Sequence, residues 1–283
     1  MRLRKGNRIK TIHSSLAIEG NKLSEDQVRD IIDGKSVIAP LREIQEVKNA
    51  MNTYELYSKL NPFSEKDLLK AHAVMMNSLT DDAGRFRHGG VGVFAGEKCV
   101  HLAPPATRVP FLIGDLFDWL KHSKDHLLIR SCVFHYEFEF IHPFSDGNGR
   151  MGRMWQTLLL MQWKPIFAWL PVETIVKENQ QKYYDAIALS DKQGNSTAFI
   201  TFMLKCILAS LKEMCESNQK SNQKSNQKVL SAISENPDIT IKELQTLIGL
   251  SESGIKKILR QLRNDGVIVR IGGAKGGHWE ILK

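Results

Sequence analysis

The sequence predicts a mainly α-helical protein with one small β-hairpin in its larger part and a separate C-terminal unit of helices and a second hairpin. Apolar residues recur at helical spacing through most of residues 24–216, whereas residues 85–100 are glycine-rich and alternate like a hairpin. A polar repeat then interrupts the apolar pattern at residues 217–228. The 283 residues suffice for one large domain, or for a medium domain and a small one.

The helices of the larger part can be placed in order from their capping residues and periodicity. Ser24 precedes acidic residues and is the expected N-cap of a helix that ends near Asp33. Pro40 begins a periodic stretch to about Leu60, and Ser64 opens the next helix. Further helices are expected at residues 125–141, 151–162, 176–190 and 196–216.

The tetrapeptide SNQK occurs three times between Ser217 and Lys228. The repeat contains no apolar residue, so it cannot contribute to a hydrophobic core. We therefore expect a flexible or loosely helical linker at this point.

The residues after the repeat predict a compact unit. A helix at residues 229–236 is followed by a second at 240–248, where Thr240 and Glu243 form a capping box. A third helix is expected from Ser251 to Asn264, and strands at 267–271 and 279–282 flank a glycine-rich turn. Helices of this order followed by a two-stranded wing are the winged form of the helix-turn-helix.

Basic side chains gather on the third helix of this unit. The positions that would meet DNA in a helix-turn-helix are Lys256, Lys257, Arg260 and Arg263, with Arg270 and Lys275 in or near the wing. The unit has five Lys and three Arg against four Glu and two Asp, a net charge of only +2. Contact with DNA and contact with protein, including formation of a homodimer, therefore both remain open.

Composition excludes several other classes of protein. Hydrophobic residues make up 42% and charged residues 25%, as in ordinary globular chains. No run of about eighteen apolar residues is present, so no membrane contact is expected. The four cysteines show no CxxC spacing, and no apolar signal core follows the basic N-terminus. We expect a cytoplasmic protein, and its charge of +8 favours a polyanionic partner.

Residues 142–153, HPFSDGNGRMGR, carry the strongest chemical signal. An apolar helix is expected on each side, so this glycine-rich loop opens a helix whose free N–H groups attract anions. Gly147 and Gly149 permit close approach of the backbone to a phosphate.

The other side chains of the loop suit the same chemistry. The Asn148 amide can donate to a phosphate oxygen, and Arg150 and Arg153 share a helix face that can clamp further phosphates. Asp146 is a hard oxygen ligand suited to Mg²⁺. His142 can act as a general base near neutral pH.

This segment resembles the Fic family, because it matches the signature HPFx[D/E]GNGRxxR at every fixed position. The resemblance extends over about residues 10–215, and it implies a Fic-type helical bundle in which a hairpin flap holds the backbone of a target protein. It also implies transfer of AMP from ATP, with Mg²⁺, to a Ser, Thr or Tyr hydroxyl. The implied domains are an N-terminal helical region (1–60), a catalytic domain (61–216), the linker (217–228) and the winged helix-turn-helix (229–283).

The resemblance also implies a role for each motif residue. His142 would deprotonate the target hydroxyl, and Asp146 would hold Mg²⁺ on the α- and β-phosphates. The phosphate-binding positions would be Gly147, Asn148, Gly149, Arg150 and Arg153. Gly149 distinguishes the chain from the phosphate-transferring Doc branch, which commonly has Lys there, and leaves room for ATP in the AMP-transferring pose.

A second pattern associated with the family, [S/T]xxxE[G/N], matches residues 15–20. In the class with an N-terminal inhibitory helix, the Glu pairs with the second Arg of the motif and blocks the γ-phosphate; here these residues are Glu19 and Arg153. Ser15 can lie on the same helical face as Glu19, and Gly20 can end the helix. The alternative is an ordinary surface helix that ends at Gly20.

Three functions remain in competition at this point. The first is a protein adenylyltransferase inhibited by Glu19, which in some related proteins also serves removal of AMP. The second is a transcriptional regulator that senses nucleotide and reads DNA, and the third is a scaffold with a silent site. The intact His142 and Asp146 favour the enzyme. The target protein stays open, as does the choice between adenine contact and packing for Tyr183 and Tyr184.

Overall fold

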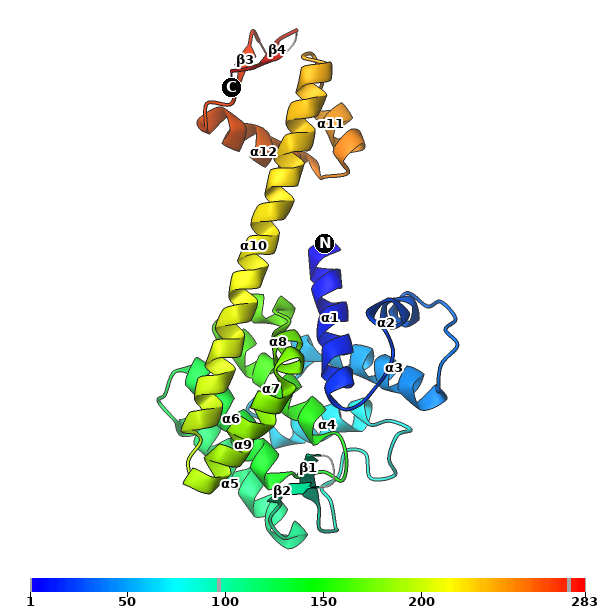
Figure 1. Ribbon diagram of the computed structural model, residues 1–283, viewed down its shortest axis with the longest axis vertical. Coiled ribbons are helices and arrows are strands. Elements are labelled where there is room, and N and C mark those ends of the chain that lie inside the picture. The colour runs from blue at the N-terminus through cyan, green and yellow to red at the C-terminus, as the bar shows by residue number, and fades with distance from the viewer. Residues whose placement is uncertain (1, 96–97, 274–275, 283) are drawn as a thin grey trace. The chain divides into compact units, whose positions relative to one another are not determined.

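The computed structural model describes residues 2–95, 98–273 and 276–282. The contacts between Cα atoms divide the chain into two compact units, Met1–Leu211 and Lys212–Lys283. Helices dominate both units, as Figure 1 shows. The predicted mainly α-helical fold with one small hairpin and a winged C-terminal unit is confirmed. In the described ranges no helix is both long enough and apolar enough to cross a bilayer.

The larger unit is a helical bundle with one hairpin. Its helices are α1 (Arg2–Ile18), α2 (Glu25–Ile32), α3 (Leu41–Glu55), α4 (Glu65–Met75), α5 (Val109–His122), α6 (Leu127–Ile141), α7 (Asn148–Trp163), α8 (Val172–Glu178), α9 (Gln180–Gln193) and the first part of α10 (Thr197–Glu235). Short 3-10 helices are η1 (Tyr57–Lys59), η2 (Ala106–Arg108) and η3 (Pro165–Trp169). The antiparallel hairpin consists of β1 (Gly92–Ala95) and β2 (Lys98–Leu102).

Helix α7 is the centre of this unit. Its side chains are buried almost without interruption from Asn148 to Leu160, and α6 packs along it. Trp155 is fully buried, and its indole N–H donates to the Pro62 carbonyl over 3.0 Å. A helix that is buried on every side has little freedom to shift, so the loop that precedes α7 rests on a fixed support.

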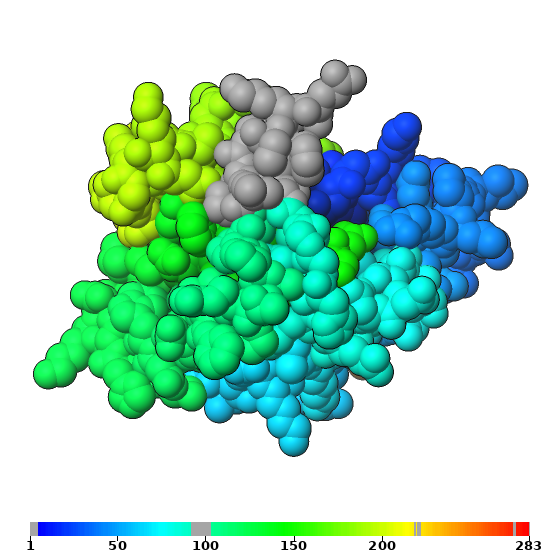
Figure 2. Space-filling model, turned by 90° about the horizontal axis from the view of Figure 1, so that it is seen from below, coloured from blue at the N-terminus to red at the C-terminus, as the bar shows by residue number. Residues whose placement is uncertain are grey.

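Helix α1 lies against α8, α2 and α3 (Figure 1). Ile9, Ile12 and Leu16 are buried at helical spacing and attach the helix to the core. Gly20 adopts a φ of 92° and terminates the helix, as the sequence predicts. Helices α3 and α4 pack together, and Figure 2 shows the blue N-terminal segment beside the cyan segment that follows α4. Because α1 is attached to the core and ends at Gly20, Glu19 has a defined place next to the bundle.

The smaller unit contains the end of α10, α11 (Ile241–Ile248), α12 (Glu252–Asn264), β3 (Ile268–Ile271) and β4 (His278–Ile281). The predicted capping box of Thr240 and Glu243 opens α11, and Ser251 caps α12. Trp279 of β4 is buried and donates its backbone N–H to the Pro237 carbonyl over 2.8 Å. The strands pair antiparallel and complete a winged helix.

Of the two forms expected for the SNQK repeats, flexible or loosely helical, the structure has the helical one: the repeats lie within α10, because Gln and Lys favour helix and a formed helix propagates at low cost. One expectation about helices needs correction. The single helix expected at residues 176–190 is two helices, α8 and α9, which meet at Asn179. The contact boundary at Leu211 lies five residues before the boundary expected at residue 216.

Candidate active site

The loop between α6 and α7 turns sharply at two residues with positive φ. His142 has a φ of 50° and a ψ of 62°, and Gly147 has a φ of 88°. A left-handed conformation is uncommon for a residue with a side chain and persists only where the surroundings enforce it. Phe144, between the two turns, is fully buried and anchors the loop in the core.

The Asn148 side chain holds the loop closed. Its Oδ1 accepts from the Phe144 backbone N–H over 2.9 Å, and its Nδ2 donates to the Phe144 carbonyl over 2.8 Å. Asn148 is only 2% exposed. From the sequence, this amide was expected to donate to a phosphate oxygen. In this structure the side chain is engaged with the loop, and an anion would instead meet the free backbone N–H groups of the first turn of α7.

A second histidine supports the loop from α4 and was assigned no role from the sequence. The His72 ring stacks on Phe144 with centroids 3.6 Å apart. Its Nδ1 accepts from the Gly84 N–H over 2.8 Å, so Nε2 carries the proton and donates to the Asp146 carbonyl over 3.0 Å. Burial lowers the pKa of His72 to about 4, so the ring stays neutral. The only sign of this role in the sequence was the position of His72 at helical spacing among apolar residues, which predicts a buried side chain.

Asp146 lies between two guanidinium groups. Its Oδ1 accepts from Arg150 Nη2 over 2.7 Å and from the Gly147 N–H over 2.6 Å. Its Oδ2 accepts from Arg42 Nη2 of α3 over 3.1 Å, a contact that the sequence did not reveal. Arg150 is almost fully buried, and its Nε has no hydrogen-bond partner among the described residues.

A metal ion at Asp146 would need further ligands from outside the protein. Across residues 2–95, 98–273 and 276–282, no cluster of three or more His, Cys, Asp or Glu side chains could hold an ion alone. The Asp146 side chain is 42% exposed, and Mg²⁺ commonly takes one or two carboxylates together with substrate phosphates and water.

Arg153 is held by the residues of the second pattern. Its Nη2 donates to Glu19 Oε1 over 2.7 Å and to the Ser15 carbonyl over 3.0 Å, and its Nε donates to Ser15 Oγ over 3.2 Å. Burial lowers the pKa of Arg153, but Glu19, Tyr183 and Glu139 together more than offset burial, and the pKa is raised. The structure thus brings Ser15, Glu19 and Arg153 together.

Gly149 lies directly beneath this ion pair. A Cβ at position 149 would overlap Glu19 Oε1 and would lie 2.9 Å from Arg153 Nη1. The family resemblance implies that the missing side chain leaves room for ATP; in this structure it makes room for the Glu19 carboxylate.

Hydrogen bonding and burial favour the neutral form of the His142 ring. Its Nδ1 lies 3.3 Å from the Glu139 carbonyl, which can only accept, so Nδ1 carries the proton and Nε2 has the free lone pair. Burial lowers the pKa of His142, and the Glu139 carboxylate, 3.9 Å from Nδ1, partly opposes this. Glu139 lies three residues before His142 on a helix, a spacing from which the sequence analysis could have inferred the contact.

A buried carboxylate lies behind Arg153. Glu173 of α8 is 2% exposed, and neither of its side-chain oxygens has a hydrogen-bond partner in the described part of the chain. Burial raises its pKa to about 7. Arg153, Gln156 and Thr157 line a small cavity with it.

The two tyrosines differ in their surroundings. Tyr183 is buried, and its hydroxyl lies 3.2 Å from His135 Nε2, so it packs in the core. Tyr184 is partly exposed and accepts from Gln180 Nε2 over 3.4 Å. The same nitrogen donates to the Ile18 carbonyl over 2.9 Å, which links α9 to the end of α1.

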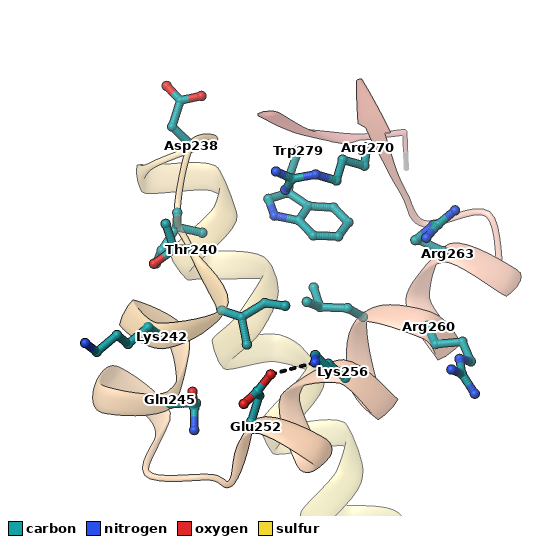
Figure 3. A pocket seen from close by; sticks show the side chains of 13 residues that line it. Asp238, Thr240, Lys242, Gln245, Glu252, Lys256, Arg260, Arg263, Arg270 and Trp279 are labelled. Carbon is teal, nitrogen blue, oxygen red and sulfur yellow. Dashed lines mark ion pairs between the residues drawn. The ribbon is translucent and has the colours of Figure 1, made fainter. Parts of the chain in front are cut away.

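The smaller unit has a basic groove of about 840 Å³ between α11, α12 and the wing. Figure 3 shows Lys256, Arg260 and Arg263 on α12 lining it with Arg270 of β3. The Arg270 guanidinium lies 4.9 Å from the centre of the Trp279 ring. Lys257 does not line the groove, and Lys275 lies outside the described residues.

Comparison with known proteins agrees with this organisation. Residues 62–160 match the Fic/DOC family, and residues 223–269 match the family described as winged helix-turn-helix DNA-binding. The crystal structure of a Fic family protein from Desulfovibrio desulfuricans G20 is similar over 99% of this chain and 87% of that chain, with 44% identity and a TM-score of 0.75. The chain therefore belongs to the Fic family.

More distant relatives extend this picture. Protein adenylyltransferase Fic of Culex quinquefasciatus is 32% identical over 210 residues, and that of Aedes aegypti is 32% identical over 211 residues. These matches cover 70% of this chain and 40% of each relative, so the chain spans about two fifths of their length. Fic-1 of C. elegans shares the fold, with a TM-score of 0.62 over 75% of this chain at 23% identity.

Proposed function

We propose that this protein is an adenylyltransferase that moves AMP from ATP to a Ser, Thr or Tyr hydroxyl of a target protein. The observation that carries the proposal is the combination of a neutral His142 in the loop before α7 with the N-terminus of α7 and the two buried arginines of that helix. The name of the relatives from Culex and Aedes supports the same reaction.

The phosphates of ATP would lie at the start of α7. The free backbone N–H groups of its first turn and the positive end of the helix dipole attract negative charge. Arg150 has a buried Nε without a partner, and the Arg153 guanidinium is the second cation. Mg²⁺ bound at Asp146 with the phosphates would neutralise charge on the leaving group.

His142 would accept the proton of the target hydroxyl at Nε2. The hydroxyl oxygen then attacks the α-phosphorus, the new O–P bond forms, and the bond to the β-phosphate breaks to release pyrophosphate. Positioning and charge stabilisation dominate such transfers. A His base typically contributes about a hundred- to ten-thousandfold.

The Glu19–Arg153 ion pair would inhibit this reaction. The pair occupies the donors of Arg153 with a carboxylate, so a phosphate that needs the same donors must displace it. The carboxylate also fills the space above Gly149.

Transfer of label from α-labelled ATP to protein tests the proposal, with native chain, Glu19→Gly and Glu19→Gly/His142→Ala compared in the presence of Mg²⁺. We expect weak labelling of the native chain, strong labelling of Glu19→Gly and none of the double variant. Equal labelling of the double variant and Glu19→Gly would remove His142 from the chemistry. Equal labelling of native chain and Glu19→Gly would remove the inhibition.

A second proposed function is DNA binding by the smaller unit. The groove places three basic residues of α12 on the face shared with Arg270 of the wing, where winged helices meet the phosphate backbone. The two functions are compatible, because DNA binding would deliver the enzyme to targets associated with nucleic acid.

A further inference from the structure

Arg87 is a buried cation in the segment between α4 and β1, and it is 2% exposed. Its Nε donates to the His142 carbonyl over 2.7 Å, and its Nη1 donates to the Gly89 carbonyl over 2.7 Å. Its Nη2 donates to the carbonyls of Pro104, over 2.5 Å, and Ile141, over 3.3 Å. Within the described ranges no carboxylate forms an ion pair with it.

These contacts join two parts of the site that are far apart in the sequence. Gly89 precedes β1 and Pro104 follows β2, so Arg87 holds both flanks of the hairpin. The other two carbonyls lie where α6 ends and His142 enters its left-handed conformation. The Arg87 backbone N–H adds a bond to the Pro143 carbonyl over 2.9 Å.

We propose that Arg87 is a positioning residue that fixes the catalytic His142 and the two flanks of the hairpin as one unit, so that a target hydroxyl held at the hairpin meets the base in a set geometry. This inference rests on the proposed adenylyl transfer. It assigns no contact between Arg87 and ATP or the target.

The chemistry of the side chain supports this role. A buried cation without a carboxylate is costly, and the guanidinium compensates through carbonyl bonds that require its planar, multiple donors. Lysine has one nitrogen and cannot reach four carbonyls in this arrangement. The same contacts constrain the backbone of His142, whose positive φ needs enforcement by its surroundings.

The charge of Arg87 gives the role a measurable signature. The groups whose charges influence the His142 imidazole include Glu139 on its own helix, Arg87 and Glu19. The two carboxylates raise the pKa of His142, whereas Arg87 lowers it in addition to the larger effect of burial. Removing the Arg87 charge should therefore raise the pKa of His142.

The first test measures self-labelling from α-labelled ATP in the Glu19→Gly background with Arg87→Lys, Arg87→Gln or the matched control Arg85→Gln. Arg85 is exposed and lies only two residues away. We expect Arg87→Lys to lower the rate at saturating ATP by about tenfold or more, with half-saturating ATP within about twofold, because the phosphate donors are elsewhere. Arg85→Gln should match the parent. An unchanged rate in Arg87→Lys would overturn the inference.

The second test follows the His142 ring by NMR through a pH titration, with its signal identified by its loss in His142→Ala. We expect a higher His142 pKa in Arg87→Gln, a return toward the parent value in Arg87→Lys, and no change in Arg85→Gln. A merely structural Arg87 would lower the melting temperature without this pattern, and that result would overturn the inference. The titration needs no activity, so it decides the role of Arg87 even if Glu19→Gly transfers no AMP and the proposed function fails.

Discussion

The arginines of the larger unit and those of the winged-helix groove carry the same charge but are held in opposite ways. Arg150 and Arg153 are each 3% exposed, and each has named partners at fixed distances. Arg260 and Arg263 are exposed on α12, and neither forms an ion pair within the part of the chain that the structure describes. Arg270 is intermediate, with Trp279 beneath it.

The difference indicates two uses of one side chain. A buried guanidinium is oriented before a ligand arrives, so its value depends on the direction of its donors. An exposed guanidinium contributes chiefly its charge, which salt screens and which a neighbouring cation can replace. Replacing Arg with Lys keeps the charge but removes the planar set of donors. The substitution should therefore impair the buried sites and leave the exposed sites nearly unchanged.

The largest effect is expected from Arg153→Lys in the Glu19→Gly background. The charge remains but the fork is lost, so transfer of label from ATP should fall by on the order of a hundredfold. Arg263→Lys in the same background should leave transfer unchanged. A loss of less than about threefold in Arg153→Lys would mean that charge alone suffices at this buried site.

Glu173→Gln tests a buried charged group that lacks a hydrogen-bond partner. The pKa of Glu173 rises from 4.5 to about 7 in the folded state, so the folded chain binds more protons than the unfolded chain between these pH values. Stability should thus fall as pH rises from 4.5 to 7. The Gln variant should avoid this loss and gain roughly 2–3 kcal/mol at pH 7.5.

Urea unfolding of the larger unit at pH 4.5 and 7.5 would measure this gain. Glu178→Gln, an exposed position at the end of the same helix, is the matched control. The expectation fails if the stability difference between Glu173→Gln and the native chain does not change with pH.

A smaller effect is expected from Glu139→Gln on the pH dependence of transfer. On the proposed function the neutral form of His142 is the base, so activity should fall as pH drops through the lowered pKa of His142. The Glu139 carboxylate raises that pKa, and its removal should move the acid limb to lower pH. Rate profiles in the Glu19→Gly background would show the shift, with Glu137→Gln on the same helix as control. A shift to higher pH would contradict the assigned geometry.

The smallest effect is expected from Arg260→Lys on binding of duplex DNA, within about twofold, because an exposed phosphate contact needs only charge. Arg260→Gln should reduce the salt-dependence slope of binding by about one. Lys257→Gln, off the groove, is the control and should change the slope less. Equal effects of Lys257→Gln and Arg260→Gln would show that the groove does not define the interface.

Local patterns predicted much of this fold and site. The signature at residues 142–153 placed the loop at a helix start, and capping residues located α2, α4, α11 and α12. These signals depend on neighbours within a few residues. The pattern at residues 15–20 also indicated a partner, Arg153, only because the family resemblance linked the two segments.

Contacts between distant segments were not predicted. Arg42 on Asp146, His72 under the loop and Arg87 on His142 reach the site from outside the signature, and no local pattern records such tertiary contacts. Asn148 was given to a phosphate because its amide is a suitable donor, but the Phe144 backbone is a nearer partner. The helical SNQK repeat shows that polar composition excludes a core, not a helix.

If the proposed function holds, the Glu19 carboxylate beside Gly149 couples nucleotide affinity to regulation. On the proposed function, Glu19 and a phosphate compete for the donors of Arg153. The apparent affinity for ATP is then the intrinsic affinity multiplied by the fraction of chains in which Glu19 has withdrawn from Arg153. By thermodynamic linkage, a partner that holds Glu19 away from Arg153 increases the affinity for ATP by a certain factor. ATP increases the affinity for that partner by the same factor. The ratio of ATP dissociation constants of the native chain and Glu19→Gly would therefore measure the strength of inhibition without any reaction taking place.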